Sequence, residues 1–276
     1  MDKKYLNMLT LDELANRSSW PARLLSLDPY EIRHKTPKSI AREFGIDKWG
    51  KLFQYFLDKN EFTLVDVEAE EQNIHEIIPC FESGIGFYST TVKEANRRQI
   101  EIFKNNLIPF IKDASCLVEL GAGYGSKLLS LSEINPLDKL PLYAAEYTKS
   151  GCDLIKLISK KTKKQVKVGS CDFDQLLIDD LEIPKNSIIF TSYSVHYVNK
   201  LKKRFVEFIA KLKPKVVVHF EPCYEYFDEN SLHGLMCKRY MELNGYTQNI
   251  ASAIEKGCSE IEAKFEVERN IFGTNP

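Results

Sequence analysis

Glycine alternates with other residues in the stretch Gly121-Ala122-Gly123-Tyr124-Gly125, and the acid Glu119 lies two residues before it. Glycines in a turn between a strand and a helix let backbone amides approach a ligand closely. A dinucleotide-binding loop would read Gly-x-Gly-x-x-Gly, but the sixth position here is Ser126. Because Glu119 would repel a phosphate, the loop favours a cationic or amine-bearing ligand. For such a loop standing alone, a purely structural turn is an equally common interpretation.

Two further acidic positions follow the loop at intervals that suit a nucleoside. Glu146 ends a second apolar run, where a carboxylate can accept hydrogen bonds from both hydroxyls of a ribose. Asp172 and Phe173 end a third run, where the acid can bond an adenine amino group and the ring can cover its face. One acid alone is usually a solvated loop residue or a helix cap. Three acids at successive strand ends indicate a ligand that contains a nucleoside.

Short apolar or β-branched runs alternate with helical patterns after residue 114. The runs cover residues 116–120, 142–145, 165–168, 187–191 and 216–220. Between the last two runs, one helical face carries Leu201, Phe205, Phe208, Ile209 and Leu212. Strands that alternate with helices indicate right-handed βαβ units on a mostly parallel sheet. The sequence predicts a Rossmann-like, doubly wound α/β domain over residues 114–276.

Residues 1–113 show helical patterns, and we expect a helical N-terminal region that does not fold independently. Thr10 and Glu13 have the spacing of a capping box. Thr36-Pro37 and Gly45 bracket a second helix, with proline at its first position and glycine after its last.

Together these features resemble the class I S-adenosylmethionine (SAM)-dependent methyltransferases, over about residues 114–272. The resemblance implies the Rossmann-like fold of that family, SAM as cofactor and S-adenosylhomocysteine (SAH) as product. It implies that the loop from Glu119 to Gly125 packs against the methionine part, that Glu146 holds the ribose, and that Asp172-Phe173 brackets the adenine. The implied cofactor site consists of Glu119, Gly121, Ala122, Gly123, Gly125, Glu146, Tyr147, Asp172 and Phe173. In related enzymes a tyrosine or arginine from before the first strand reaches the cofactor carboxylate, which suggests Tyr88 and Arg98.

The end of the sheet departs from the family's pattern, in which an antiparallel seventh strand is hairpinned to the sixth. Residues 264–271 are predicted to form the sixth strand, and five residues follow them. Either the seventh strand is missing, another segment takes its place, or the chain is shortened.

The resemblance also suggests the catalytic residues. Methyl transfer from a sulfonium is an in-line displacement, so the protein mainly positions the acceptor atom and excludes water. An acceptor that is protonated at neutral pH also needs a base. Tyr193, His196 and Glu221, at the ends of the fourth and fifth strands, are the candidates. His196 could equally be a hydrogen-bonded histidine at a helix start, and Glu221 could cap the following helix.

Aromatic and basic residues suggest where the acceptor binds. The candidates are Trp20, Arg23, Arg33, Tyr197 and Tyr224. Guanidinium and aromatic groups suit an acceptor with π-faces or a carboxylate. We therefore expect residues from about Trp20 to Trp49 to form a lid over the acceptor. The alternatives are that these residues only fasten the helices to the domain, or that the helices mediate dimer contacts.

Charge and cysteine content exclude several classes of protein. The 38 basic and 39 acidic side chains leave a net charge of −1, which argues against a globally basic nucleic-acid binder. Residues 156–167 and 200–215 are lysine-rich, and we interpret them as solvated helix faces, with RNA docking as the alternative. Seven cysteines without metal-ligand spacing indicate reduced thiols in a cytoplasmic protein with no bound metal. No signal peptide or membrane helix is expected.

The sequence thus predicts a SAM-dependent methyltransferase acting on an N or O atom of a small molecule or a short natural-product peptide. One alternative is an RNA or protein methyltransferase that uses the lysine-rich faces. The other is a non-catalytic module that binds the cofactor.

Overall fold

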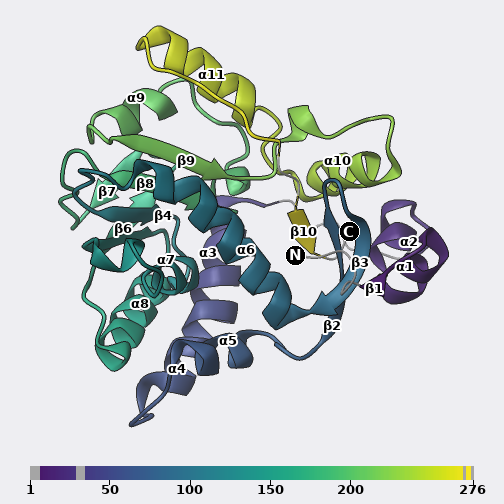
Figure 1. The fold of residues 1–276 in the computed structure, drawn as a ribbon, viewed down its shortest axis with the longest axis horizontal. Coiled ribbons are helices and arrows are strands. Elements are labelled where there is room, and N and C mark those ends of the chain that lie inside the picture. Colours follow the sequence, from purple (N-terminus) through teal and green to yellow (C-terminus); the bar gives the residue numbers. More distant parts are fainter. Residues whose placement is uncertain (1–6, 29–34, 270–271, 275–276) are drawn as a thin grey trace.

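Two sheets organise the chain in the computed structural model, which describes residues 7–28, 35–269 and 272–274 (Figure 1). The larger sheet has six strands in the order β7-β6-β5-β4-β8-β9. The smaller has four strands in the order β1-β3-β2-β10. Residues 1–6, 29–34, 270–271 and 275–276 lie outside the described ranges, and Arg33 is among them.

The six-stranded sheet confirms the predicted doubly wound fold. Its parallel strands are β4 (Leu117–Leu120), β5 (Leu142–Glu146), β6 (Val166–Asp172), β8 (Ile188–Ser192) and β9 (Val216–Phe220). The short β7 (Leu177–Asp179) pairs antiparallel with β6 at one edge. Each predicted run therefore becomes a strand, and the third extends as far as Asp172.

Helices cover both faces of this sheet, because neighbouring residues of each strand point to opposite sides. On one face, Val118 and Ile189 pack with residues of α9 (Phe205–Ala210) and α11 (Ile250–Glu260). On the other face, Leu117 and Ile188 pack with residues of α6 (Val92–Leu107), α7 (Ser126–Leu131) and α8 (Lys149–Thr162). Figure 1 shows α9 and α11 above the sheet and α8 below it.

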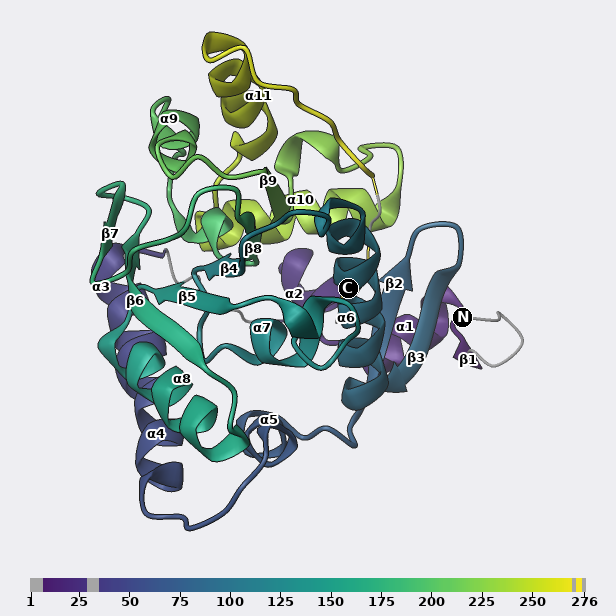
Figure 2. The ribbon, with the colours of Figure 1, turned by 60° about the vertical axis from the view of Figure 1, so that its left-hand side comes forward.

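The first helices follow the sequence prediction in part. Thr10 and Glu13 form the predicted capping box of α1 (Leu11–Arg17), which α2 (Trp20–Leu24) follows. Gly45 does not end the next helix as predicted, because α3 (Pro37–Arg42) continues through a π-helix, η2 (Glu43–Lys48), into α4 (Trp49–Leu57). The Gly45 carbonyl accepts a hydrogen bond of 2.7 Å from Ser150 Oγ, so this glycine is a packing point against the start of α8. Figure 2 shows α4 alongside α8, with α5 (Leu64–Glu71) following.

The expectation of an all-helical N-terminal region is wrong for residues 77–91. These residues form an antiparallel hairpin of β2 (Ile77–Glu82) and β3 (Gly86–Thr91), to which β1 (Asn7–Met8) adds. The predicted sixth strand is also wrong, since residues 264–269 are not in a strand. Instead β10 (Phe272–Thr274) pairs antiparallel with β2, where the hairpin edge offers backbone hydrogen-bonding groups.

The remaining described elements are one longer helix and four short ones. They are α10 (Leu232–Asn244) and the short helices η3 (Ile108–Phe110), η4 (Leu137–Lys139), η5 (Val195–Tyr197) and η6 (Tyr224–Tyr226). Helix α10 packs against α2 through Leu24, Met236 and Leu243. Among the described residues, no helix has the length and apolar character needed to cross a membrane.

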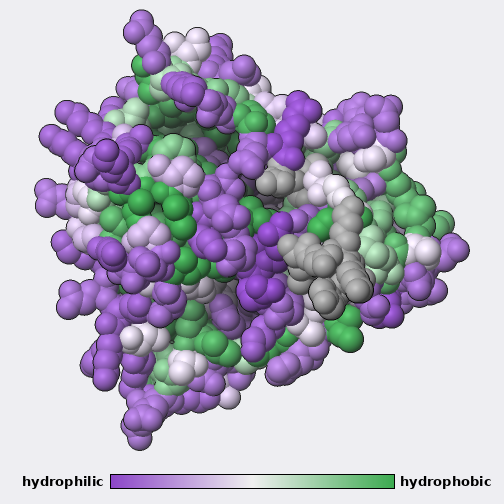
Figure 3. All heavy atoms as spheres, in the orientation of Figure 1, coloured by the Kyte–Doolittle hydropathy of each residue, from purple (hydrophilic) through white to green (hydrophobic). Residues whose placement is uncertain are grey.

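The lysine-rich stretches lie on outer helices, as interpreted from the sequence. Figure 3 shows hydrophilic side chains along the edge where α8 and α9 lie. Several of these lysines bind the protein itself: Lys161 Nζ donates to the Asn60 carbonyl at 2.9 Å, and Lys164 Nζ pairs with Glu133 at 2.9 Å. Part of this charge therefore fastens α8 to its neighbours.

Candidate functional site

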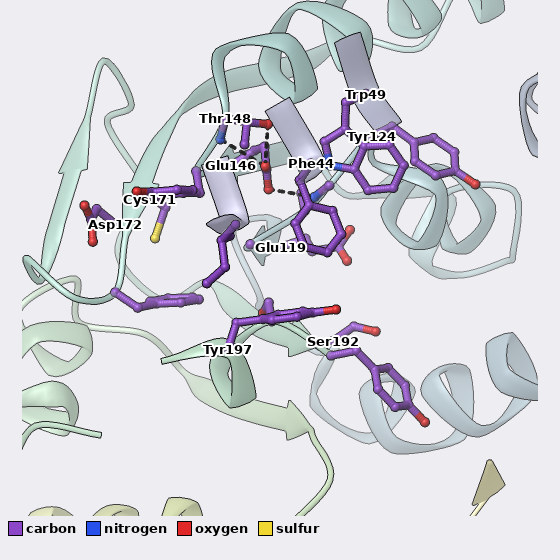
Figure 4. Close-up of a pocket in the computed structure, with 18 of the residues that line it drawn as sticks. Phe44, Trp49, Glu119, Tyr124, Glu146, Thr148, Cys171, Asp172, Ser192 and Tyr197 are labelled. Carbon is purple, nitrogen blue, oxygen red and sulfur yellow. Dashed lines mark hydrogen bonds between the residues drawn. The ribbon is translucent and has the colours of Figure 1, made fainter. Parts of the chain in front are cut away.

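A cavity of about 260 Å³ opens at the carboxyl ends of β4, β5, β6 and β8 (Figure 4). This is the edge of a doubly wound sheet at which ligands usually bind. The lining residues are Pro37, Ile40, Phe44, Trp49, Glu119, Gly121, Ala122, Gly123, Tyr124, Ser126, Lys127, Glu146, Tyr147, Thr148, Cys171, Asp172, Phe173, Asp174, Ser192, Tyr193, Ser194, Tyr197 and Val198. All three groups of acids singled out from the sequence border this one space.

The glycine loop between β4 and α7 forms one wall and needs its glycines. Gly121 and Gly123 have φ angles of +74° and +57°, which side-chain-bearing residues rarely adopt. A Cβ on Gly121 would lie 2.4 Å from the Cβ of Ser194, which is a steric clash. Gly125 also has a positive φ, but it precedes α7 and packs against Ile155 rather than lining the cavity.

Glu146 is 5% exposed and already holds the loop together. Its Oε1 accepts hydrogen bonds from Thr148 N at 3.0 Å and Thr148 Oγ1 at 2.8 Å, and its Oε2 accepts one from Gly123 N at 2.8 Å. Burial raises the pKa of Glu146, and these hydrogen bonds partly offset the effect. A carboxylate offers about four acceptor positions. Glu146 can therefore take one further hydroxyl at Oε2, and a second if the Thr148 hydroxyl turns away.

Asp172 and Phe173 lie beyond Glu146, at the end of β6. Asp172 Oδ1 accepts a hydrogen bond of 2.9 Å from Gln175 N, which fixes the turn after the strand. Phe173 is nearly buried against Phe205, and Tyr147 is 38% exposed beside the cavity. In Figure 4, Asp172 and Cys171 lie on one side of Glu146, while Glu119 and Tyr124 lie on the other.

The segment after β8 forms the floor of the cavity. Tyr193 lines it in a left-handed conformation with φ of +49°, which is uncommon for a residue with a large side chain. Its hydroxyl donates to the Phe272 carbonyl at 3.3 Å and so contacts β10. Tyr197 also lines the cavity, and its ring lies 5.2 Å from that of Phe44.

His196 and Glu221, proposed from the sequence as catalytic residues, do not line the cavity. The Glu221 side chain is fully buried and accepts hydrogen bonds from the backbone amides of Ser194 at 3.0 Å and Val195 at 3.1 Å. His196 Nδ1 lies 3.1 Å from Glu221 Oε2. The two residues are therefore turned towards each other, and Glu221 caps the turn after β8 rather than the helix that follows it.

His219 lies on β9 and contacts a residue of the neighbouring strand β8. Its Nδ1 lies 2.9 Å from Thr191 Oγ1, and burial lowers its pKa to about 4.

Tyr88 and Arg98, expected at the cofactor carboxylate, are also away from the cavity. Arg98 forms an ion pair with Glu82, and the buried Tyr88 hydroxyl donates to the same carboxylate at 3.4 Å. These residues join the β2–β3 hairpin to α6. Sequence position alone does not distinguish a side chain that faces a cofactor from one that is paired inside the protein.

The acceptor-side residues are only partly brought to the cavity. Trp20 packs edge-on against Tyr240 with ring centroids 4.9 Å apart, and Arg23 lies over Trp20. The Tyr224 hydroxyl donates to Glu242 at 2.7 Å. None of these three borders the cavity, whereas four residues between 37 and 49 do: Pro37, Ile40, Phe44 and Trp49. The C-terminal half of the expected lid segment therefore covers the site.

Sequence reasoning missed several lining residues, above all Phe44, Tyr124, Thr148 and Lys127. Lys127 had a usable signal, because it lies two residues after the last glycine of the loop. No feature of the sequence indicated Phe44, since η2 reaches the cavity only because it packs on α8. Within the described ranges, no group of three or more histidines, cysteines or acids could hold a metal ion.

No family model matches the sequence, and no curated protein matches it. Among solved structures, a geranyl diphosphate methyltransferase with bound GPP and sinefungin is similar at a TM-score of 0.50 and 14% identity, over 81% of this chain and 78% of that one. A SAM-dependent methyltransferase from Aquifex aeolicus is similar with a TM-score of 0.32 and 17% sequence identity. That match covers 42% of this chain and 66% of the other. The plantazolicin methyltransferase BpumL is similar with a TM-score of 0.40 and 11% sequence identity. That match covers 82% of this chain and 78% of the other.

The first of these similarities, together with the sheet order and the two helical layers, shows the fold. The chain has the Rossmann-like fold of the class I SAM-dependent methyltransferases.

Proposed function

We propose that this protein is a SAM-dependent methyltransferase that transfers a methyl group to an N or O atom of a small molecule or a short natural-product peptide. The observation that carries the proposal is that the glycine loop, Glu146 and the Asp172-Phe173 pair border one cavity. These are the groups that a ligand containing a nucleoside needs, in the order in which it needs them.

The residues of the cavity fit SAM. Asp172 and Phe173 suit the adenine at one end, and Glu146 in the middle suits the ribose. Beyond Glu146, the rings of Phe44, Trp49 and Tyr197 present π-faces, which attract a cation such as a sulfonium. When bound, SAM would supply an activated methyl group.

The protein's own contribution would be to position the acceptor and to keep water out. Pro37, Ile40 and Phe44 give an apolar cover on the acceptor side, formed by α3 and η2. Tyr193 and Tyr197, after β8, line the floor of the same cavity. Since His196 and Glu221 bind each other, the proposal assigns proximity and orientation the larger part of the rate enhancement, and assigns His196 no role as a base.

SAH binding tests this proposal directly. Titration calorimetry of the full chain with SAM, SAH and NAD is expected to give binding of the first two and none of the third. The reason is that Glu146 suits ribose hydroxyls, while the acid Glu119 beside the loop disfavours a pyrophosphate. Tight binding of NAD without binding of SAH would contradict the proposal.

Methyl transfer is expected to need no metal ion. The sulfonium already activates the methyl group, so a Lewis acid has nothing to add at the reacting carbon. Once an acceptor is found, turnover of radiolabelled SAM should be the same with and without EDTA. Activity that is lost in EDTA and restored by one divalent cation would contradict this prediction.

A further inference from the structure

Strand β9 is the outermost strand of the six-stranded sheet on the side of β8 (Figure 1). Among the described residues it pairs with β8 alone, so its other edge presents backbone N–H and C=O groups without a partner strand. The Phe220 carbonyl accepts a hydrogen bond of 3.1 Å from the Tyr193 amide, so the backbone groups of Phe220 face β8. Because these groups alternate along a strand, those of Val217 and His219 face the open edge.

The open edge of β9 lacks the features that usually protect an edge strand. Proteins keep such strands short or place charges and prolines on them. At the opposite edge β7 has three residues and ends on Asp179, and the edge strands β1 and β10 of the smaller sheet have two and three. Strand β9 has five residues, Val-Val-Val-His-Phe, all partly exposed, whereas β4 and β5 are buried along their whole length. An apolar edge of this length is a template for pairing with another strand.

The two ends of β9 lie beside surfaces of opposite charge. The chain enters β9 through three exposed lysines, Lys211, Lys213 and Lys215. An acidic segment, residues 260–268, contains four glutamates and one lysine. Arg269, which follows this segment, lies 4.7 Å from the centre of the Tyr226 ring, and Tyr226 belongs to η6, just after β9. The edge therefore has a basic end at the start of β9 and an acidic end beyond its last residue.

The acidic segment is extended and holds its charges at the surface. Lys264 and Glu266 form an ion pair across one intervening residue, and their side chains are 82% and 73% exposed. Phe265, between them, packs instead against the hydrophobic cluster that includes residues of α9 and α11. This alternation is the strand-like pattern that the sequence shows over residues 264–271. The segment is thus anchored by its apolar side, and its polar side is accessible to a neighbouring molecule.

We infer that β9 pairs with the β9 of a second copy of this chain, related by a two-fold axis, to form a dimer with one continuous sheet. A two-fold axis through the middle of the edge reverses the strand direction, so the two strands run antiparallel and exchange N–H···O=C hydrogen bonds. The same axis places the acidic end of each copy beside the basic end of the other. The surface is therefore self-complementary, as a two-fold interface requires.

The charge pattern favours a second copy over a foreign peptide strand. An acidic peptide would meet the basic end favourably and the acidic end unfavourably, and a basic peptide would do the reverse. Like charges placed against each other disfavour the wrong partner. A second copy matches both ends at once.

The oligomeric state of the full chain tests the inference, which does not depend on the proposed function. Analytical ultracentrifugation over a range of concentrations is expected to show a species of about twice the chain mass of 31.8 kDa. Hydrogen exchange of the peptide that covers residues 216–220 should slow as the fraction of dimer rises, because the free amides of the edge become hydrogen-bonded.

The variant Val217→Pro removes an amide that faces the open edge and keeps the hydrogen bonds to β8. Proline is tolerated in edge strands at positions of this kind. At a concentration at which the wild type is dimeric, this variant is expected to sediment as a monomer. The matched control Val217→Thr keeps the amide and the branched side chain and should remain a dimer. Circular dichroism verifies that each variant is folded.

Charge reversal gives a second test, which does not depend on a proline in the sheet. Lys213→Glu and Glu266→Lys change exposed residues at opposite ends of the edge. Each is expected to weaken the dimer about tenfold, because the two-fold axis repeats the altered charge. An equal mixture of the two variants should associate to within about threefold of wild type, since each reversed charge then meets its reversed counterpart. The matched control is Lys160→Glu, an exposed lysine on α8, with no change expected.

Three results would overturn the inference. The first is a wild type that stays monomeric up to about 100 μM, and protection of the edge amides in that monomer would show that a segment of the same chain covers β9. The second is a dimer that persists in folded Val217→Pro, because another surface would then hold the copies together. The third is a mixture of the charge-reversed variants that associates no better than either alone.

Discussion

Replacing Glu146 with alanine is expected to weaken SAH binding at least about tenfold, since one charge-assisted hydrogen bond is worth about 1.5–3 kcal/mol. Glu146 has an acceptor position left at Oε2 for a ribose hydroxyl. Its loss would also leave the amides of Gly123 and Thr148 without their acceptor, so the glycine loop itself should loosen. Titration calorimetry with SAH measures the effect.

Two further variants distinguish an effect on SAH binding from an effect on folding. Glu146→Gln keeps the size of the side chain but places an amide group against neighbours that are all donors, so it should weaken binding as well. Glu133→Ala removes an exposed acid near α7 and is the matched control, with no change expected. Unchanged SAH affinity in folded Glu146→Ala would mean that this acid serves only the loop.

Replacing Glu221 with alanine is expected to lower the free energy of unfolding by about 3–5 kcal/mol, because several buried donors lose a charged acceptor at about 1.5–3 kcal/mol per hydrogen bond. The Glu221 side chain is fully buried and binds the amides of Ser194 and Val195 together with the His196 ring. Urea unfolding measures the loss. The matched control is Glu207→Ala on α9, whose exposed side chain pairs with Arg204 and should lose far less stability. A loss in Glu221→Ala no greater than in the control would contradict the assigned role.

The contacts of the Glu221 carboxylate also predict how the free energy of unfolding depends on pH. Burial alone would raise the pKa of Glu221, but the hydrogen bond and charge of His196 and the backbone donors outweigh it, so the pKa is lowered. A lowered pKa in the folded state means that the stabilisation is fully present above the unfolded value of about 4.3. It is lost as the pH falls through the folded value.

The difference in unfolding free energy between wild type and Glu221→Gln should therefore be constant above about pH 5 and shrink below about pH 4. The neighbouring titratable groups are His196 on η5 and His219 on β9, so the comparison with His196→Gln is needed to isolate the carboxylate. A difference that grows on acidification would contradict the assignment.

Glu221 also helps to shape the floor of the cavity. The turn that it caps carries Ser194 and Tyr197 to the cavity floor and follows the left-handed Tyr193. The buried Glu221 carboxylate, which accepts hydrogen bonds from two consecutive amides, fixes this turn between β8 and η5. His196 and Glu221, two of the three residues proposed from the sequence as catalytic, thus hold the cavity floor in place without lining the cavity.

The amino-acid sequence by itself determined the doubly wound domain and the edge at which the cavity lies. Alternating strands and helices leave little choice of topology, because βαβ connections are right-handed. Parallel strands end at the same edge, so acids that follow successive strands must come close together in any such fold. For this reason Glu119, Glu146 and Asp172 could be placed from the sequence, as could the local capping box at Thr10 and Glu13.

Only the tertiary structure decided which other side chains reach the cavity. Arg98 pairs with Glu82 sixteen positions away, and His196 with Glu221 twenty-five positions away, so these residues point away from the ligand side. Phe44 reaches the cavity because η2 packs against the start of α8, and β10 lies beside β2 because the hairpin leaves an open edge. The spacing of residues in the sequence indicates the periods of strands and helices. Contacts between distant residues depend instead on how the whole chain packs.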